Sequence, residues 1–176
     1  MLKKYIITGA PGTGKSTLIK GLQSKGVLCG EEVSRAIIIR EQFAKGDGMP
    51  WNNMERFSQL VFEETMLRFK TQKNTVICDR SLVDIIAYLK HAQMEVLKPL
   101  DNIDFHQYYH EKVFVASPWA TIYKTDPQRP EPFQAQLALS KIIESVYLSY
   151  GFTLCYLPCV TVEERISFVM DECSFS

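Results

Sequence analysis

The chain has 176 residues, of which 46% are apolar, and its 20 acidic side chains balance its 20 basic ones. This length predicts a single domain over residues 1–176 with a buried core, and the balanced charge argues against nucleic-acid and membrane-surface partners, which usually need a basic excess. No apolar run has transmembrane length, no signal peptide is evident, and the five scattered cysteines fit reduced thiols, so we expect a cytoplasmic protein.

A glycine-rich stretch near the N-terminus fits the pattern G-x-x-x-x-G-K-[ST], a P-loop. The run at 4–8 before it predicts a buried strand, and the apolar spacing at 16–22 after it predicts a helix. Backbone N–H groups of such a turn point at phosphates, and the helix N-terminus adds partial positive charge. We therefore expect ATP to bind here with Mg²⁺, although the motif does not distinguish ATP from GTP. The residues expected to contact the nucleotide are Gly9, Ala10, Pro11, Gly12, Thr13, Gly14, Lys15, Ser16 and Thr17.

The rest of the chain alternates short apolar strands with amphipathic helices, which predicts an α/β fold with a parallel sheet covered by helices on both faces. Residues 101–112 carry no clear pattern, and the three prolines within 121–132 indicate an excursion over the surface. In chain order the patterns predict a strand at 26–30, a helix at 36–43, a long helix at 54–70, a strand at 75–78, a helix at 82–97 closed by Pro99, a strand at 113–116, a helix at 133–150 capped by Gly151, a strand at 153–157, and a last helix with a capping box at Thr161.

Ligands of a parallel sheet bind beyond the carboxyl ends of its strands, so residues that follow the predicted strands are candidates for chemistry. Asp79 follows the third strand and is predicted to hold Mg²⁺ together with Ser16, while Lys15 contacts the β- and γ-phosphates. Glu32 follows the second strand, where a carboxylate can accept the proton of a substrate hydroxyl. The spacing leaves open whether Glu31, Glu32 or Asp79 is the base.

Further polar side chains after these strands predict a site for the phosphate acceptor. Arg35 lies about one helical turn beyond the predicted base, and Arg80 lies where it can contact a phosphate with two nitrogens. Asp84 and Tyr88 are one turn apart on the following helix and are placed to face the acceptor. A solvated helix face with a packing tyrosine is the plain alternative for this last pair.

The excursion at 121–132 contains Arg129, which is predicted to close over the phosphates as part of a lid. A mobile basic segment of this kind excludes water and stabilises the charge on the transferring group. The alternative is an ordinary surface arginine in a loop.

Together these motifs resemble one family. The P-loop, Glu32–Arg35, the run 40–42, Asp79-Arg80-Ser81 with Asp84, and Asp126–Arg129 are similar to the AAA-type predicted ATPase family that takes in the kinase domain of NadR-like nicotinamide riboside kinases. The acid-Arg-Ser motif also resembles deoxynucleoside and nucleoside monophosphate kinases. The third strand lacks the adjacent acid pair of ring-forming AAA motors, which favours a kinase over a mechanical ATPase.

The resemblance implies a three-layer P-loop NTPase fold with strand order 2-3-1-4-5 and a lid segment. It also implies Glu32 as the base, Arg129 as a phosphate contact, and Pro158 beside the nucleotide base.

We therefore expect an ATP-dependent phosphotransferase that moves the γ-phosphoryl group of ATP to a nucleoside, nucleotide or similar small metabolite. Its catalytic residues would be Lys15, Glu32, Asp79 and Arg129. The alternative is a nucleotide switch or binding protein that hydrolyses ATP or GTP without a small-molecule acceptor. The sequence does not identify the acceptor, and it leaves open whether the chain forms a homodimer.

Overall fold

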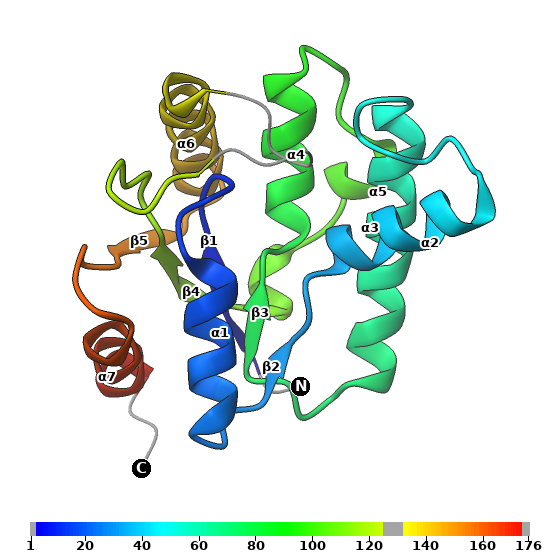
Figure 1. Ribbon diagram of the computed structural model, residues 1–176. Helices are drawn as coiled ribbons and strands as arrows, with labels where there is room; N and C mark the ends of the chain where they lie inside the picture. The colour runs from blue at the N-terminus through cyan, green and yellow to red at the C-terminus, as the bar shows by residue number, and fades with distance from the viewer. Residues whose placement is uncertain (1–2, 125–131, 174–176) are drawn as a thin grey trace.

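The structure is a computed structural model that describes residues 3–124 and 132–173. Five parallel strands form one sheet in the order β2-β3-β1-β4-β5, with helices on both faces (Figure 1), which confirms the predicted fold. The strands are β1 (Lys4–Thr8), β2 (Cys29–Gly30), β3 (Ile77–Asp79), β4 (Tyr109–Val115) and β5 (Thr153–Tyr156). The helices are α1 (Lys15–Ser24), α2 (Val33–Ala44), α3 (Met54–Thr71), α4 (Leu82–His91), α5 (Lys98–Asp101), the short 3-10 helix η1 (Phe105–Gln107), α6 (Phe133–Ser149) and α7 (Val162–Cys173).

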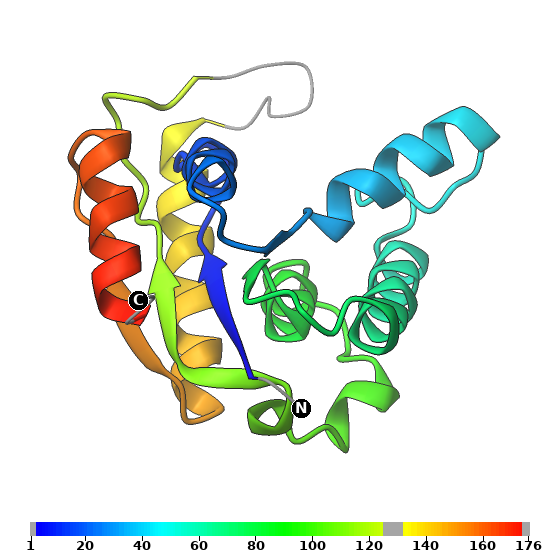
Figure 2. The same cartoon turned by 90° about the horizontal axis from the view of Figure 1, so that it is seen from below.

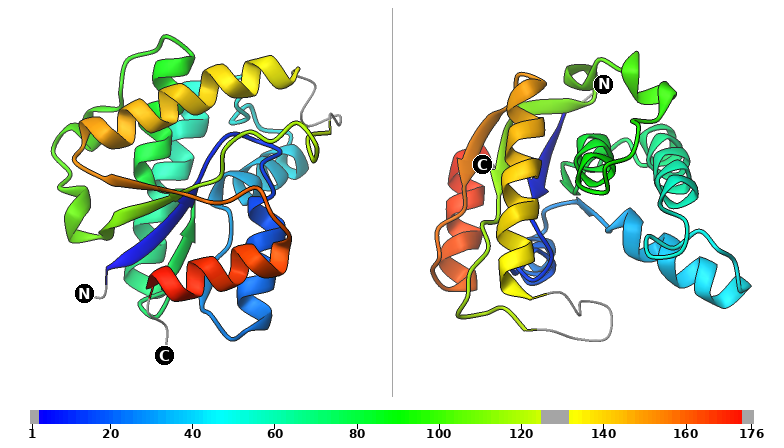
Figure 3. Two further views of the ribbon diagram at one scale, coloured as in Figure 1. Left: turned by 90° about the vertical axis from the view of Figure 1, so that its left-hand side faces the viewer. Right: turned by 90° about the horizontal axis from the view of Figure 1, so that it is seen from above.

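Alternating side chains of the central strands divide the core into two layers. Ile6 of β1 packs with buried residues of α3, α4 and α6, whereas the next residue, Ile7, packs with α1 and α7. Figure 2 and Figure 3 show α7 and α6 on opposite sides of the sheet, and α2 lying outside α3, away from the strands. In the described part of the chain no helix is both long and apolar enough to span a membrane.

The helix predicted at 82–97 is wrong at its C-terminal end. It stops at His91 as α4, because Gln93 adopts a left-handed conformation with φ +57°. The backbone N–H groups of Gln93 and Met94 then bond to the carbonyl oxygens of Lys90 and Leu89, which is a Schellman motif. Pro99 does not close a helix. It lies at the start of α5, where its missing N–H costs nothing.

Other boundaries also differ from the prediction. Strand β2 covers only two residues of the predicted 26–30, and α2 begins at Val33 rather than at 36. Strand β4 begins at Tyr109, four residues before the predicted start, within a region that carried no clear pattern. Strand β3 begins at Ile77, two residues after the predicted start, and ends at Asp79. The capping box at Thr161 is confirmed, because the Glu164 N–H donates to Thr161 Oγ1 at 3.3 Å and the Thr161 N–H donates to Glu164 Oε2 at 3.0 Å.

Candidate active site

The P-loop connects β1 to α1 at the carboxyl end of the sheet (Figure 1). Its path takes three glycines, Gly9, Gly12 and Gly14, into positive φ, a conformation that favours glycine. Gly9 has φ +137°, and a Cβ there would collide with the carbonyl oxygen of Ala116 in the loop after β4. Gly14 has φ +82° and is the N-cap of α1, where it turns the chain into the helix. The loop is therefore shaped for an anion at the helix N-terminus.

Lys15 is the first residue of α1, and its side chain folds back over the loop. Its Nζ donates to the carbonyl oxygens of Gly9 at 2.9 Å and Ala10 at 2.8 Å. Burial, together with the nearby charge of Arg80, lowers the pKa of the Lys15 ammonium group to about 7. A triphosphate in the loop would offer this nitrogen full negative charges in place of neutral carbonyl groups.

Asp79 ends β3 in register with Ile7 of β1, so it lies beside the P-loop. Its side chain is buried, and no described residue donates a hydrogen bond to its Oδ1. Burial, together with Glu32 nearby, raises the pKa of the Asp79 carboxyl to about 6. A buried carboxylate oxygen without a donor fits a cation ligand. Asp79 and Ser16 are suited to Mg²⁺, which usually takes one or two carboxylates together with nucleotide phosphates.

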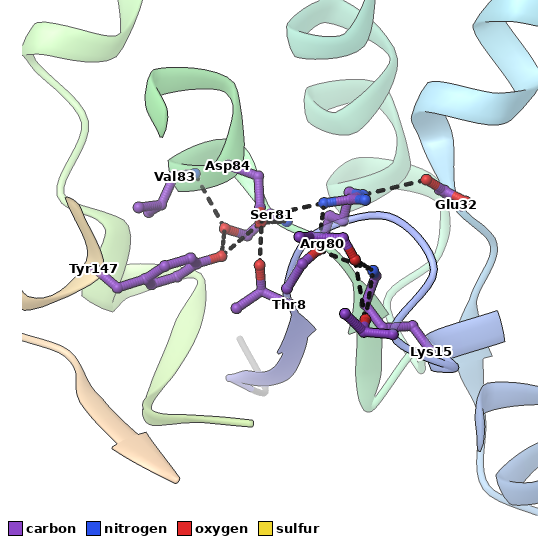
Figure 4. Close-up of polar contacts among 11 residues, drawn as sticks. Thr8, Lys15, Glu32, Arg80, Ser81, Val83, Asp84 and Tyr147 are labelled. Carbon is purple, nitrogen blue, oxygen red and sulfur yellow. Dashed lines mark hydrogen bonds and ion pairs between the residues drawn. The ribbon is translucent and has the colours of Figure 1, made fainter. Parts of the chain in front are cut away.

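Glu32 and Arg80 form an ion pair inside the site (Figure 4). Glu32 is the N-cap residue of α2, but its side chain does not cap the helix; its Oε1 accepts from Arg80 Nε at 3.2 Å instead. Burial favours a higher pKa for the Glu32 carboxyl, but the charges of Arg80 and Lys15 outweigh burial and lower that pKa below its ordinary value. Glu32 is therefore ionised at neutral pH, as a general base requires. The adjacent Glu31 is exposed.

Arg80 connects the P-loop to this carboxylate. Its Nη1 donates to the Gly9 carbonyl oxygen at 3.0 Å and lies 3.7 Å from Asp84 Oδ1. Its guanidinium carbon lies 5.3 Å from the centre of the Tyr88 ring, a cation–π arrangement. The backbone of Arg80 has φ +67°, a conformation that is unfavourable for a residue with a Cβ and that concentrates at functional sites. These contacts fix the guanidinium between the P-loop and Glu32.

Asp84 is the centre of a buried hydrogen-bond network (Figure 4). Its Oδ1 accepts from the Thr8 hydroxyl, and its Oδ2 accepts from the Ser81 backbone N–H at 2.8 Å and from the Tyr147 hydroxyl at 2.6 Å. Ser81 is the N-cap of α4 and forms a capping box with Asp84. The network joins β1, α4 and α6 next to Arg80. Asp84 thus has a structural role, and its direct contact with an acceptor stays a prediction.

One cleft of about 1090 Å³ contains these groups. Its volume is at the top of the range for small-molecule sites, which leaves room for a nucleotide and a second molecule. Beyond Glu32 and Arg80 the walls include the apolar side chains of Phe57 and Val61 of α3, Ile85 of α4 and Leu139 of α6, beside polar ones such as Ser58 and Gln136. The cleft therefore combines a charged end at the P-loop with a partly apolar end between three helices.

The structure brings most of the predicted site residues to this cleft. Pro158 does not line it, but residues 160 and 161 of the same loop and Val162 at the start of α7 do. Arg35 is at the rim, with its side chain 60% exposed and its Nε 3.9 Å from Glu32 Oε2. Arg129 lies outside the described residues. The predicted residues that line the cleft are Pro11, Gly12, Thr13, Gly14, Lys15, Ser16, Thr17, Glu32, Arg35, Asp79, Arg80, Asp84 and Tyr88.

Three residues that shape the site were missed from the sequence. Thr8 precedes the P-loop motif directly, which is the one signal that could have identified it. Tyr147 belongs to the apolar stripe of α6, and only the packing of α6 on α4 brings its hydroxyl to Asp84. Arg165 of α7 donates from Nη1 to the Thr13 carbonyl oxygen at 3.2 Å, across 152 residues of chain. No local pattern predicts the contacts of Tyr147 or Arg165.

Comparison with solved structures identifies the fold. Similar chains are the deoxyadenosine kinase from M. mycoides with the products dCMP and a flexible dCDP (TM-score 0.68, 18% identity, 97% of this chain and 98% of that one) and the same enzyme with bound dATP (TM-score 0.65, 18% identity, 98% and 99%). A third is the dCTP complex of that enzyme (TM-score 0.62, 19% identity, 97% and 98%). At these identities the likeness establishes a shared P-loop kinase fold.

A comparison with curated proteins gives no match. The family model described as AAA domain matches residues 4–165, which include the P-loop, both predicted metal ligands and the acceptor-side residues. Because this match covers nearly the whole chain, the protein belongs to the AAA domain family.

Proposed function

We propose that this protein is a small-molecule kinase that transfers the γ-phosphoryl group of ATP to a hydroxyl or phosphate group of a nucleoside, a nucleotide or a similar metabolite. The observation that carries the proposal is the placement of Arg80, which contacts both the P-loop carbonyl of Gly9 and the carboxylate of Glu32. One guanidinium thus lies between a phosphate-binding loop and an ionised carboxylate, which is where a phosphoryl group would pass from donor to acceptor.

The shape of the cleft supports an acceptor larger than water. A protein that only hydrolyses a nucleotide needs to position one water molecule, and it gains nothing from an apolar wall beyond its catalytic carboxylate. Here that wall, with Phe57 and Val61, is suited to the ring of an organic acceptor. The solved deoxyadenosine kinases of similar fold hold deoxynucleotides, which supports an acceptor of the nucleoside type.

Each residue has a defined task in this proposal. Lys15 binds the β- and γ-phosphates, and Glu32 orients the acceptor hydroxyl and accepts its proton. Arg80 stabilises the negative charge of the transferring group. Ser16 and Asp79 would hold Mg²⁺, which supplies charge neutralisation between the phosphates when it is bound. Arg129 is proposed as a lid residue from the sequence alone.

The test compares phosphate transfer with phosphate release. Purified protein would receive ATP and Mg²⁺ with ribonucleosides, deoxynucleosides, nucleoside monophosphates or nicotinamide riboside, and separately with GTP as donor. We expect one acceptor class to accelerate ADP formation and to give a phosphorylated product in equal amount. If ADP forms at one rate with every acceptor and no product appears, the protein is a hydrolase or switch instead.

Two variants of neighbouring residues test the base. Glu32→Gln should lower the rate of transfer by about 10²- to 10⁴-fold while ATP affinity changes little, because general base catalysis is worth roughly that factor. Glu31→Gln is the matched control, since Glu31 is exposed. This variant should keep both the rate of transfer and the ATP affinity of the parent chain. Equal rates in the two variants would exclude Glu32 as the base.

A further inference from the structure

Thr8 is fixed at the end of β1, directly before the P-loop. It pairs with Val115 of β4, and its carbonyl oxygen accepts from the Ala116 N–H at 2.8 Å. Its side chain is fully buried, and its hydroxyl donates to Asp84 Oδ1 (Figure 4). Because β1 is the central strand of the sheet and central strands open last, this hydroxyl is a fixed donor beside the site.

The contacts of Thr8, Asp84 and Arg80 close a ring around the start of the P-loop. Arg80 Nη1 lies 3.7 Å from Asp84 Oδ1, the oxygen that accepts the Thr8 hydroxyl. The same nitrogen donates to the carbonyl oxygen of Gly9 at 3.0 Å, and Gly9 follows Thr8 directly in the chain. Two consecutive residues therefore act on one end of the guanidinium, Gly9 directly and Thr8 through Asp84.

The distance between Arg80 and Asp84 is longer than a direct hydrogen bond. Nitrogen and oxygen in a bonded guanidinium–carboxylate pair usually lie about 2.7 to 2.9 Å apart, so Arg80 Nη1 stops roughly 1 Å short. The Thr8 hydroxyl takes up Oδ1, and the Gly9 carbonyl takes up Nη1. From Nε the same guanidinium donates to Glu32 Oε1 at 3.2 Å. Arg80 thus bonds to the P-loop and to Glu32 rather than to Asp84.

The other oxygen of Asp84 is held from two further directions, so the carboxylate cannot turn. Oδ2 accepts from the Ser81 N–H and from the Tyr147 hydroxyl. Without the Thr8 hydroxyl, the buried Oδ1 would lose its donor, and Arg80 Nη1 is the N–H group nearby that can replace it. Figure 4 shows Asp84 and Glu32 on opposite sides of the Arg80 side chain. Because a guanidinium is planar and rigid, a move of Nη1 toward Asp84 carries Nε away from Glu32.

We propose that Thr8 is a positioning residue for phosphoryl transfer. Its hydroxyl occupies Asp84 Oδ1 and thereby keeps the guanidinium of Arg80 from closing on Asp84, so that the guanidinium stays between Gly9 and Glu32. Thr8 touches neither the nucleotide nor the acceptor in this role, because its side chain is fully buried. The inference rests on the proposed function for its effect on a rate, whereas the place of Arg80 is a property of the protein without ligands.

The first experiment measures how fast the Arg80 Nε–H exchanges with solvent, by NMR of the isotope-labelled full chain without nucleotide. The loss of one signal in Arg80→Lys assigns it. Thr8→Val keeps the shape of the side chain and removes the hydroxyl, whereas Thr8→Ser keeps the hydroxyl. We expect exchange to be at least about tenfold faster in Thr8→Val, because the bond to Glu32 opens, and to stay within about threefold of the parent chain in Thr8→Ser.

Two results of this experiment would overturn the proposal. Unchanged exchange in Thr8→Val would show that the hydroxyl does not set the place of Arg80. Equal acceleration in Thr8→Val and Thr8→Ser would show that packing around the side chain, and not the hydroxyl, is responsible.

The second experiment measures transfer to the acceptor that the activity assay identifies. Thr8→Val should lower kcat about 10- to 100-fold while the Kd for ATP stays within about twofold, since a misplacement of about 1 Å can cost up to the larger of these factors. In an Asp84→Asn background the same change should cost no further activity, because the path through Asp84 is already cut. Equal fold losses in both backgrounds would show that Thr8 only supports β1, and would overturn the proposal.

A third variant keeps the proposal testable if Thr8→Val does not fold. Thr8→Cys places a weakly donating thiol where the hydroxyl was, so it should also accelerate the exchange of the Arg80 Nε–H. Exchange at the rate of the parent chain would contradict the role of the hydroxyl. The NMR measurements need neither nucleotide nor acceptor. The absence of phosphoryl transfer would therefore overturn the kinase function without affecting the outcome for Thr8.

Discussion

Asp79→Asn is expected to stabilise the protein in the absence of nucleotide and metal, and to abolish the proposed phosphoryl transfer. Burial and Glu32 raise the pKa of the Asp79 carboxyl from 3.8 to about 6, so the folded protein binds this proton more tightly than the unfolded chain. Between about pH 4 and pH 6 the folded state then carries more protons, and its stability falls as the pH rises through that window. A shift of this size corresponds to about 3 kcal/mol.

The Asn side chain is always neutral, as the protonated Asp79 carboxyl is. Above about pH 6 the variant should therefore be more stable than the parent chain by up to about 3 kcal/mol, and near pH 4 the two should be alike. In a domain of this size such a gain raises the melting temperature by about 6 to 12 °C. The assay is urea unfolding at intervals between about pH 4 and pH 8 without nucleotide.

Two controls define the result. Asp101 is an exposed aspartate on α5, and Asp101→Asn should change the free energy of unfolding by less than about 0.5 kcal/mol at every pH. Saturating ATP and Mg²⁺ should stabilise the parent chain far more than the Asp79→Asn variant, because the variant lacks the anionic side chain that is proposed to hold the metal. A variant that is less stable than the parent at pH 8, or a difference that does not change with pH, would refute the reasoning.

Two further predictions concern the hydroxyl and ammonium groups of the site. Tyr147→Phe should destabilise the protein by about 2 kcal/mol in urea unfolding, because the buried Asp84 side chain loses a hydrogen-bond donor. Tyr156→Phe removes a donor to Glu144 at an exposed position and should cost about 0.5 kcal/mol or less, so equal losses would contradict the network. ATP binding at about pH 8 should take up a proton, because the pKa of Lys15 is about 7 without ligand and phosphate charges raise it. Calorimetry in two buffers of different ionisation enthalpy would detect this proton uptake as a difference in the binding enthalpy. ATP affinity should also fall as the pH rises above 7. The Lys15→Met variant should show no dependence of the binding enthalpy on the buffer.

The fold could be predicted from the sequence because its elements are defined by local patterns. Each apolar run of the strands and each periodic helix lies within one window of sequence, and the strand order followed from a resemblance carried by several motifs. The errors lie where a tertiary contact overrides the pattern. Tyr109 begins β4 although its surroundings are polar, because β4 pairs with β1 from Lys4 onward. At the end of α4 a single left-handed residue, Gln93, stops a helix whose apolar spacing continues.

The site was predicted unevenly for the same reason. The P-loop and Asp79 have sequence signals, since a phosphate site needs glycines and a lysine in fixed order and a sheet places its ligands at strand ends. The contact of Arg165 with Thr13 joins residues 152 positions apart, and only the packing of α7 against α1 creates it. Spacing cannot reveal such a pair.

Asp84 shows how a motif can identify a residue and still leave its task open. Its place one turn after Asp79-Arg80-Ser81 made it a candidate contact for the acceptor, and the structure does put it at the cleft. Both of its carboxylate oxygens, however, already accept hydrogen bonds from three different elements. A carboxylate with these donors is held in one position, and it lies 3.7 Å from the guanidinium of Arg80. Asp84 can therefore be required for the proposed transfer without touching a substrate, by holding the guanidinium of Arg80 between the P-loop and Glu32.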